Sequence, residues 1–138
     1  MHLEVINLRD FAARYTAAWC SQNAASVAEF YSPDGSLTVN GGTPAIGRRE
    51  ITDAAQSFMS AFPDMQVLMD DLLVNDETAE YYWTLVGTTT GPGGKGKRVH
   101  ISGYEEWSIG PDRLIASSHG HFNAAEYQRQ LEHGADEE

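Results

Sequence analysis

The chain has 138 residues, a formal net charge of −11 and one cysteine. This length predicts a single domain (1–138), with a core over about 7–131 and an acidic tail at 132–138. The charge excludes nucleic acid and anionic membranes as partners, because phosphate binding requires clusters of Lys and Arg. Cys20 has no partner for an intramolecular disulfide, and Met1–Asp10 lacks the apolar region of a signal peptide, so we expect a cytoplasmic protein.

The first half of the chain is patterned mainly for helices. Apolar residues at three- and four-residue spacing predict a helix over about Leu8–Gln22, with Asn7 as its N-cap. Later segments predict, in order, a short helix over Ala24–Tyr31, a turn at Ser32–Gly35, a strand over Ser36–Asn40 and a helix over about Arg48–Ala61.

The second half is patterned for strands joined by Gly-rich turns. The predicted strands are Met65–Val74 with a bulge at Asp70–Asp71, Glu80–Thr90, Lys97–Ile109 and Leu114–Phe122. A short helix over Asn123–Leu131 closes the chain. Helices followed by an antiparallel meander predict an α+β fold, with the helices packed on one face of a curved sheet.

Glu105 interrupts the apolar face of the strand predicted over Lys97–Ile109. Side chains two residues apart share one side of a strand, so Glu105 lies on the face of Val99, Ile101 and Trp107. An ionised carboxylate in apolar surroundings is costly, and its pKa rises. We interpret Glu105 as a group at a cavity or one that moves protons. A salt bridge or hydrogen bond in the core, or a shifted register that exposes it, are the alternatives.

Tyr15 lies on the apolar stripe of the first predicted helix. Its ring could pack in the core with the hydroxyl at a polar rim, which is common for tyrosine. The hydroxyl could instead donate a hydrogen bond to a substrate oxygen. Both interpretations stay open at this point.

The predicted hairpin tip contains a weak resemblance to a phosphate-binding loop. Gly91, Gly96 and Lys97 match the start of that pattern. Arg98, however, stands where a Ser or Thr would hold magnesium, and a strand follows instead of a helix. We therefore expect no nucleotide site.

Four other residues have the chemistry of a site without its context. His119 and His121 share one face of the last predicted strand, with His100 as the candidate third ligand on a neighbouring strand. Zinc uses three or four protein ligands, so we predict no metal site and place both histidines on an outer face. Cys20 has no activating base nearby, and we interpret it as a packing residue.

The order of these elements resembles the nuclear transport factor 2-like superfamily, in its SnoaL-like polyketide-cyclase branch. The resemblance spans about Asn7–Leu131, and the segments that carry it are Arg14–Trp19, Val27–Tyr31, Ala45–Arg48 and the last two strands. It implies a cone-shaped curved antiparallel sheet with helices packed on its concave face and an open end that admits an apolar ligand. We also expect a homodimer through the outer sheet face.

The resemblance also implies roles for individual residues. Matched to ketosteroid isomerase, Tyr15 falls at the oxyanion-hole tyrosine and Glu105 at the protonated aspartate that donates a hydrogen bond. The proton-shuttling aspartate of the isomerase falls in Val39–Asn40, where no acid stands. The acid of cyclases and epoxide hydrolases falls at about Gly120. The resemblance therefore implies an oxyanion hole without the usual bases.

We predict an isomerase or cyclase that acts on a hydrophobic carbonyl compound, with Glu105 and Tyr15 as catalytic residues and no metal or cofactor. The residues expected to line its apolar cavity are Trp19, Phe30, Asn40, Phe58, Met59, Phe62, Trp83, Trp107, Ser118 and Phe122. Two alternatives stay open: a non-catalytic binding protein for a small apolar molecule, and a dimerisation module with a vestigial pocket.

Overall fold

The structure is a computed structural model that describes residues 5–76, 78–89 and 96–134, with side chains from Leu8 onward. Its elements in chain order are α1 (Val5–Cys20), α2 (Ala24–Ala28), β1 (Tyr31–Val39), β2 (Ala45–Ile46), α3 (Gly47–Ala61), β3 (Gln66–Asn75), β4 (Thr78–Thr88), β5 (Arg98–Ile109), β6 (Ile115–Phe122) and α4 (Ala124–His133). No helix in these residues is long and apolar enough to cross a membrane.

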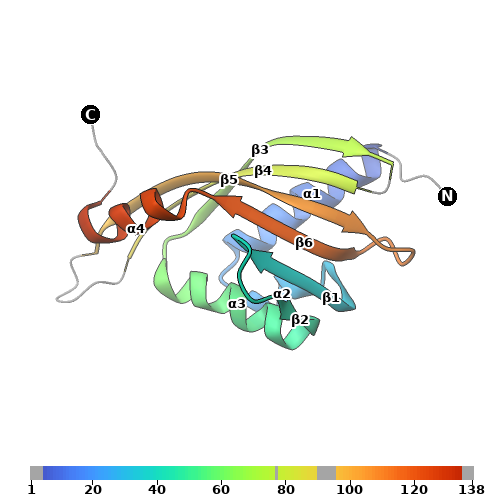
Figure 1. The fold of residues 1–138 in the computed structure, drawn as a ribbon, viewed down its shortest axis with the longest axis horizontal. Helices are drawn as coiled ribbons and strands as arrows, with labels where there is room; N and C mark the ends of the chain where they lie inside the picture. Colours follow the sequence, from blue (N-terminus) through green and yellow to red (C-terminus); the bar gives the residue numbers. More distant parts are fainter. Residues whose placement is uncertain (1–4, 77, 90–95, 135–138) are drawn as a thin grey trace.

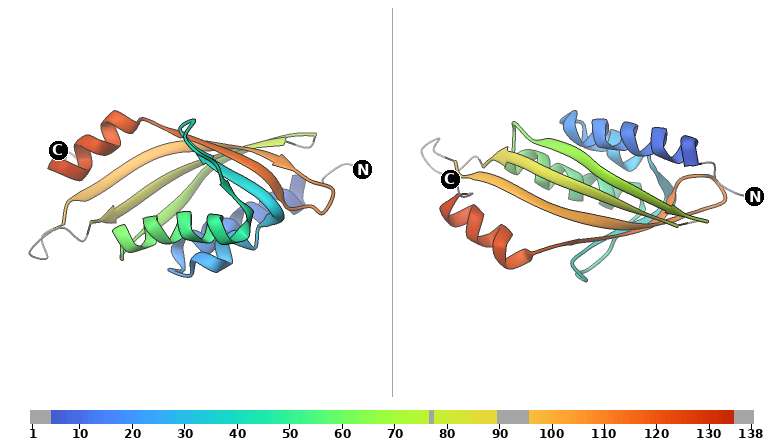
Figure 2. Two further views of the ribbon diagram at one scale, coloured as in Figure 1. Left: turned by 60° about the horizontal axis from the view of Figure 1, so that its bottom comes forward. Right: turned by 90° about the horizontal axis from the view of Figure 1, so that it is seen from above.

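The strands form one curved sheet in the order β2-β1-β6-β5-β4-β3 (Figure 1). The strands β3 to β6 pair antiparallel, as predicted, whereas β1 pairs parallel with β6. That one pair corrects the prediction of a purely antiparallel sheet. The helices α1, α2 and α3 lie on the concave face, and α4 lies at one end of the sheet beside β5 (Figure 2). The predicted α+β cone is therefore confirmed.

The helix α1 buries one side against the concave face of the sheet. Its buried residues follow the predicted three- and four-residue spacing: Leu8, Phe11, Ala12, Tyr15, Ala18 and Trp19. The helix begins at Val5, so Asn7 lies inside it and does not cap it, contrary to the prediction. This placement directs Tyr15 and Trp19 toward the centre of the sheet.

Tyr31 lies at the start of β1 and not at the end of a helix. The helix α2 ends at Ala28, three residues earlier than predicted. Residues 32–35, predicted as a turn, lie inside β1, and the register with β6 shifts between Tyr31 and Ser36. An added Cβ on Gly35 would lie 2.8 Å from the carbonyl oxygen of Ile115, so the missing side chain lets this irregular segment stay against β6.

The strand β5 shows the predicted alternation. Its buried residues are Val99, Ile101, Glu105, Trp107 and Ile109, and its exposed ones are Arg98, His100, Ser102, Glu106 and Ser108. The bulge predicted at Asp70–Asp71 is confirmed by a register shift between Met69 and Asp71. The phosphate-loop pattern lies outside the described residues except for Gly96, Lys97 and Arg98.

Candidate functional site

The carboxylate of Glu105 accepts three hydrogen bonds on one oxygen, Oε1. The donors are the Tyr15 hydroxyl at 2.9 Å, Nε1 of Trp107 at 2.8 Å and the Ser118 hydroxyl at 3.0 Å. Glu105 is 8% exposed. No described residue donates to its other oxygen, Oε2. The acid is therefore held rigidly through one oxygen, and the other stays available.

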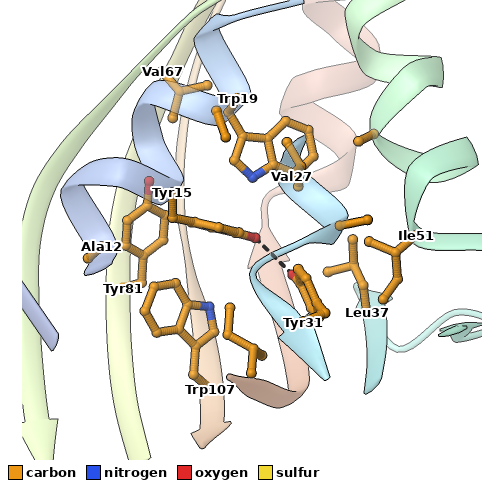
Figure 3. Packing of buried hydrophobic residues seen from close by; sticks show 14 of the residues in the cluster. Ala12, Tyr15, Trp19, Val27, Tyr31, Leu37, Ile51, Val67, Tyr81 and Trp107 are labelled. Atoms are coloured by element: carbon orange, nitrogen blue, oxygen red, sulfur yellow. Dashed lines mark hydrogen bonds between the residues drawn. The ribbon is translucent and has the colours of Figure 1, made fainter. Parts of the chain in front are cut away.

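A second phenol extends this network. The hydroxyls of Tyr31 and Tyr15 lie 2.8 Å apart (Figure 3). Each phenol has one proton, and the proton of Tyr15 is donated to Glu105, so Tyr31 is the donor to Tyr15. The network therefore runs in one direction, from β1 through α1 to β5.

Aromatic rings pack against the network. Trp107 stacks on Tyr81 with a centroid separation of 4.9 Å and an interplanar angle of 15°. The ring of Tyr15 packs edge-on against Trp107, Tyr81 and Phe30, at 5.2, 5.4 and 5.6 Å. These contacts exclude water from Oε1 and fix the orientation of its donors.

Burial is the main cause that raises the pKa of Glu105 above its ordinary value of 4.5, and the three hydrogen bonds to Oε1 partly oppose it. Burial, followed by the charge of Glu105, also raises the pKa of Tyr15 and of Tyr31 well above 10.0. The indole of Trp19, which points toward the Tyr15 oxygen, partly lowers the pKa of Tyr15 without forming a hydrogen bond. The site therefore keeps both phenols protonated and favours the neutral acid.

A cavity of about 60 Å³ lies beside Glu105. It is lined by Trp19, Leu37, Val39, Phe58, Val67, Tyr81, Trp83, Leu85, Ile101, Glu105, Gly120, Phe122 and Tyr127. Glu105 is the one charged group among these described residues. Typical ligand pockets measure roughly 300–1,000 Å³, so a ligand of ordinary size has to displace lining side chains. The half-buried residues Phe58, Trp83, Phe122 and Tyr127 are the ones placed to move.

Four of the residues expected to line the cavity lie on its wall: Trp19, Phe58, Trp83 and Phe122. Trp107 and Ser118 lie behind the wall, where both donate to Oε1 of Glu105. Tyr15 is also behind the wall and fully buried. The structure therefore brings the candidate catalytic pair together and divides the expected ligand-binding residues into a lining group and a supporting group.

The remaining expected residues lie away from the cavity wall. Asn40 has a positive φ of 51°, and its Oδ1 accepts the backbone N–H of Phe122, so its side chain fastens β1 to β6. Phe62 is buried beside Gly87. Met59 is buried in the core, and Phe30 packs against Phe11 and Tyr15.

Sequence reasoning missed three tyrosines of the site. The sequence pattern predicts Tyr31 at the end of a helix, so it gives no indication that Tyr31 lies beside Tyr15. Tyr81 lies on the same face of β4 as Trp83, and this two-residue spacing could have identified it. Tyr127 lies on α4 and contacts Phe122 at 5.2 Å, which depends on how α4 folds back.

The candidate metal ligands lie on the outer side of the sheet. Nε2 of His121 lies 2.9 Å from Glu106, and its ring lies 4.9 Å from that of Tyr104. His100 pairs with Val86, four positions along β5 from the partner of His121. No group of three metal-ligating side chains occurs in the described part of the chain.

Cys20 makes two contacts with the backbone of β3. Its thiol donates to the carbonyl of Val67 at 3.4 Å, and its sulfur accepts the N–H of Val67 at 3.2 Å. These contacts join the end of α1 to the sheet, which agrees with a packing role.

Several solved structures share this fold. TsrD from Streptomyces laurentii is 20% identical with a TM-score of 0.80, covering 94% of this chain and 97% of its own. A Catenulispora acidiphila protein with a ketosteroid isomerase-like fold, solved in complex with trimethylamine, is 13% identical with a TM-score of 0.79. The match covers 89% of this chain and 92% of that protein. The epoxide hydrolase/cyclase-like enzyme SalBIII, which has a role in pyran ring formation in the polyether salinomycin, is 13% identical with a TM-score of 0.76. The match covers 87% of this chain and 93% of SalBIII.

A search of the curated proteins finds no match to this chain. The SnoaL-like domain family matches residues 12–118, which include the second half of α1, most of the sheet and the whole Glu105 network. The solved structures add the ketosteroid isomerase-like architecture around the same cone. The chain therefore belongs to the SnoaL-like domain family.

Proposed function

We propose that this protein is an isomerase or cyclase that acts on a hydrophobic carbonyl compound, with neutral Glu105 as the group that holds the substrate oxygen. One observation carries the proposal: Oε1 of Glu105 takes three internal donors, while the residue itself lines an otherwise apolar cavity. The family includes proteins of this chemical type, and the residues of this chain determine how the chemistry would work.

The three donors on Oε1 favour Oε2 as the oxygen that carries the proton of a neutral Glu105. Oε1 already accepts from Tyr15, Trp107 and Ser118, so a proton on that oxygen would conflict with three donors. We therefore assign the proton to Oε2, from which it would be donated to a ligand in the cavity that Glu105 lines. An O–H in a dry, apolar site is a strong hydrogen-bond donor to a carbonyl that develops enolate charge.

Tyr15 acts through Glu105 in this proposal. Its hydroxyl is fully buried, it does not line the cavity, and its proton is donated to Oε1. Tyr15 is therefore a positioning residue that orients the carboxyl group, with Tyr31 as its own donor. Glu105 is the residue that contacts the substrate.

The reaction would proceed by loss of a proton from the carbon next to the carbonyl. The electron pair of the C–H bond moves to the carbonyl oxygen, and Glu105 stabilises the charge on that oxygen. Water that enters with the substrate takes the proton, because the described lining residues contain no second carboxylate and no histidine.

Deuterium exchange at the α-carbon of 2-tetralone, followed by NMR, tests the proposal without assuming a product. Glu105→Leu should lower the exchange rate by about 10²–10³, as for loss of an oxyanion donor. Glu105→Gln should lose only about tenfold, because an amide N–H can still donate into the cavity. Glu106→Gln, the neighbouring acid on the opposite face, is the matched control and should leave the rate unchanged.

The two Glu105 variants separate a donor from a base. If Gln and Leu at this position lose activity equally, Glu105 accepts the proton and the proposed role is wrong. The pH dependence gives a second criterion: a neutral donor loses activity as the pH rises through its raised pKa, whereas a base gains it. A native protein that exchanges no faster than buffer contradicts the enzyme altogether.

A non-catalytic binding protein is the second candidate, and the absence of a second carboxylate or a histidine among the described lining residues favours it. In that case apolar ketones raise the melting temperature in proportion to the logarithm of their concentration, and no α-deuterium appears. The same samples of 2-tetralone and protein serve for both measurements.

A further inference from the structure

Two indole N–H groups are buried without a hydrogen-bond acceptor in the described part of the chain. They are Nε1 of Trp19 and Nε1 of Trp83. A buried tryptophan N–H normally has a partner, and Trp107 shows this, because its Nε1 donates to Glu105. Both unpaired groups belong to side chains that line the cavity. Their coincidence at one cavity requires an explanation.

Trp83 lies one step along the sheet from Glu105. The strand β4 pairs Trp83 with Gly103, which precedes Glu105 by two residues on the same face of β5. Such a step measures about 6.6–6.8 Å. An added Cβ on Gly103 would lie 2.7 Å from Cζ2 of Trp83, so the glycine lets the indole lie flat against the sheet.

Trp19 lies on the same side of the Glu105 network as Trp83. It follows Tyr15 by one turn of α1, and the adjacent Cys20 is bonded to Val67, which pairs with Leu85 on β4. Trp19 therefore lies near the Val67–Leu85 pair, two residues along β4 from Trp83, and the two indoles line the helical and the sheet wall of the cavity. The nitrogen of Trp19 is on the side of its ring toward Tyr15 (Figure 3), and it forms no hydrogen bond within the described residues.

We infer that the ligand of this cavity carries a hydrogen-bond-accepting oxygen in addition to the carbonyl at Glu105, and that the N–H groups of Trp19 and Trp83 bind it. The ligand class is an apolar compound with two or more carbonyl or ether oxygens. The inference rests on the proposed function, which places the first carbonyl at Glu105. It adds a second polar subsite about one strand step away.

Specificity follows from the cost of leaving these donors unpaired. A hydrocarbon in the cavity covers both indole N–H groups without an acceptor, whereas an oxygenated ligand supplies one. Sites with dedicated hydrogen-bonding groups discriminate strongly against analogues that lack the partner atom. Both N–H groups are covered by neighbouring side chains, so the ligand reaches them by the same displacement of lining residues that the small cavity requires.

The three tryptophans of the chain allow a direct test by ¹⁵N NMR. The probes are cyclohexane, cyclohexanone and cyclohexane-1,4-dione, which share one carbon ring. The indole signals are assigned with Trp19→Phe and Trp83→Phe. The dione should move the signals of Trp19 and Trp83 downfield, as new hydrogen bonds form, and cyclohexane should move neither downfield. The Trp107 signal is the internal control, because its N–H is already bonded to Glu105.

Trp19→Phe and Trp83→Phe should each bind the dione about tenfold more weakly and should bind cyclohexane as tightly as the native protein does. Phe122→Leu, which alters the wall without removing an N–H, should change both affinities alike. The inference is overturned if the dione binds without moving either indole signal downfield, or if none of the probes binds. None of these readouts depends on turnover. The inference can therefore fail while the native protein still catalyses α-deuterium exchange, and it can hold when the native protein catalyses none.

Discussion

The hydroxyl of Tyr15 on α1 donates to Oε1 of Glu105 on β5 over 2.9 Å, although 90 residues separate the two in sequence. Both groups are buried, so this bond joins a helix to the middle of the sheet in surroundings that exclude water. It also sets the state of the acid. Each donor on Oε1 stabilises the carboxylate, so removing one raises the pKa of Glu105 further.

Tyr15→Phe should lower the free energy of unfolding by about 1–3 kcal/mol, the usual cost of a lost buried hydrogen bond. The change also removes the acceptor of the Tyr31 hydroxyl. Urea denaturation at pH 7 measures the effect. Tyr82→Phe is the matched control, because Tyr82 donates to Glu80 at 2.8 Å on the solvent side of β4 and should cost under about 0.5 kcal/mol. If the two variants lose the same free energy of unfolding, burial does not strengthen the Tyr15–Glu105 hydrogen bond.

Glu105→Gln should change how stability depends on pH. The folded protein holds the proton of Glu105 above pH 4.5, where the unfolded chain releases it. Native Glu105 therefore contributes most below the unfolded pKa, and this contribution falls as the pH rises toward the folded pKa. The difference in free energy of unfolding between the native protein and the Gln variant should move in favour of the variant from pH 4.5 upward. A constant difference between pH 4 and 8 would mean that burial does not raise the pKa.

The homodimer expected through the outer sheet face leads to a third prediction. Leu68 and Leu73 on the edge strand β3 are 52% and 51% exposed, and their neighbours Val67 and Leu72 are buried on the opposite face of the strand. Leu73→Asp should convert a dimer into a monomer, because an ionised acid at an apolar contact is costly. Light scattering after gel filtration gives the mass. Ile46→Asp, 57% exposed on β2 at the opposite edge of the sheet, should leave the dimer intact. A native protein that elutes as a monomer contradicts the prediction.

The burial of Glu105 followed from the sequence because strand periodicity is strict. Each position along β5 alternates between the two faces, so Trp107 and Ile101 identify the side on which Glu105 lies. The spacing of α1 identified Tyr15 in the same way. That the two residues touch came only from the family resemblance, since periodicity assigns a face and not a partner.

The rest of the network depends on tertiary contacts that leave no local pattern. Tyr31 joins Tyr15 because residues 32–35 stay in the sheet, where Pro33 and Gly35 alone favour a turn. Asn40 was expected at the cavity from a matched position. Its side chain bonds instead to the backbone of β6, because its left-handed φ turns the chain there. Strand pairing therefore overrides local turn chemistry at residues 32–35, whereas at Asn40 the turn itself directs the side chain to the backbone of β6.

Gly103→Ala should be strongly destabilising, and Gly120→Ala should not. Gly103 lies two residues before Glu105 on β5, and Gly120 on β6 pairs with Glu105. A methyl group on Gly103 would lie 2.7 Å from Trp83 and 2.9 Å from Cβ of Phe122, and closer still to the backbone oxygen of His121. Overpacking of this kind costs about 1–3 kcal/mol or more, and it should displace the Trp83 indole from the cavity wall.

At Gly120 the nearest atoms to an added Cβ are Cγ of Glu105 and the carbonyl oxygen of Thr38, both at 3.7 Å, an ordinary contact distance. Thermal unfolding of the two variants, with the indole ¹⁵N signal of Trp83 as the local readout, measures both effects. If the two alanines cost the same, or if Gly103→Ala leaves the Trp83 signal in place, the close packing of Trp83 on Gly103 is not what shapes this part of the cavity.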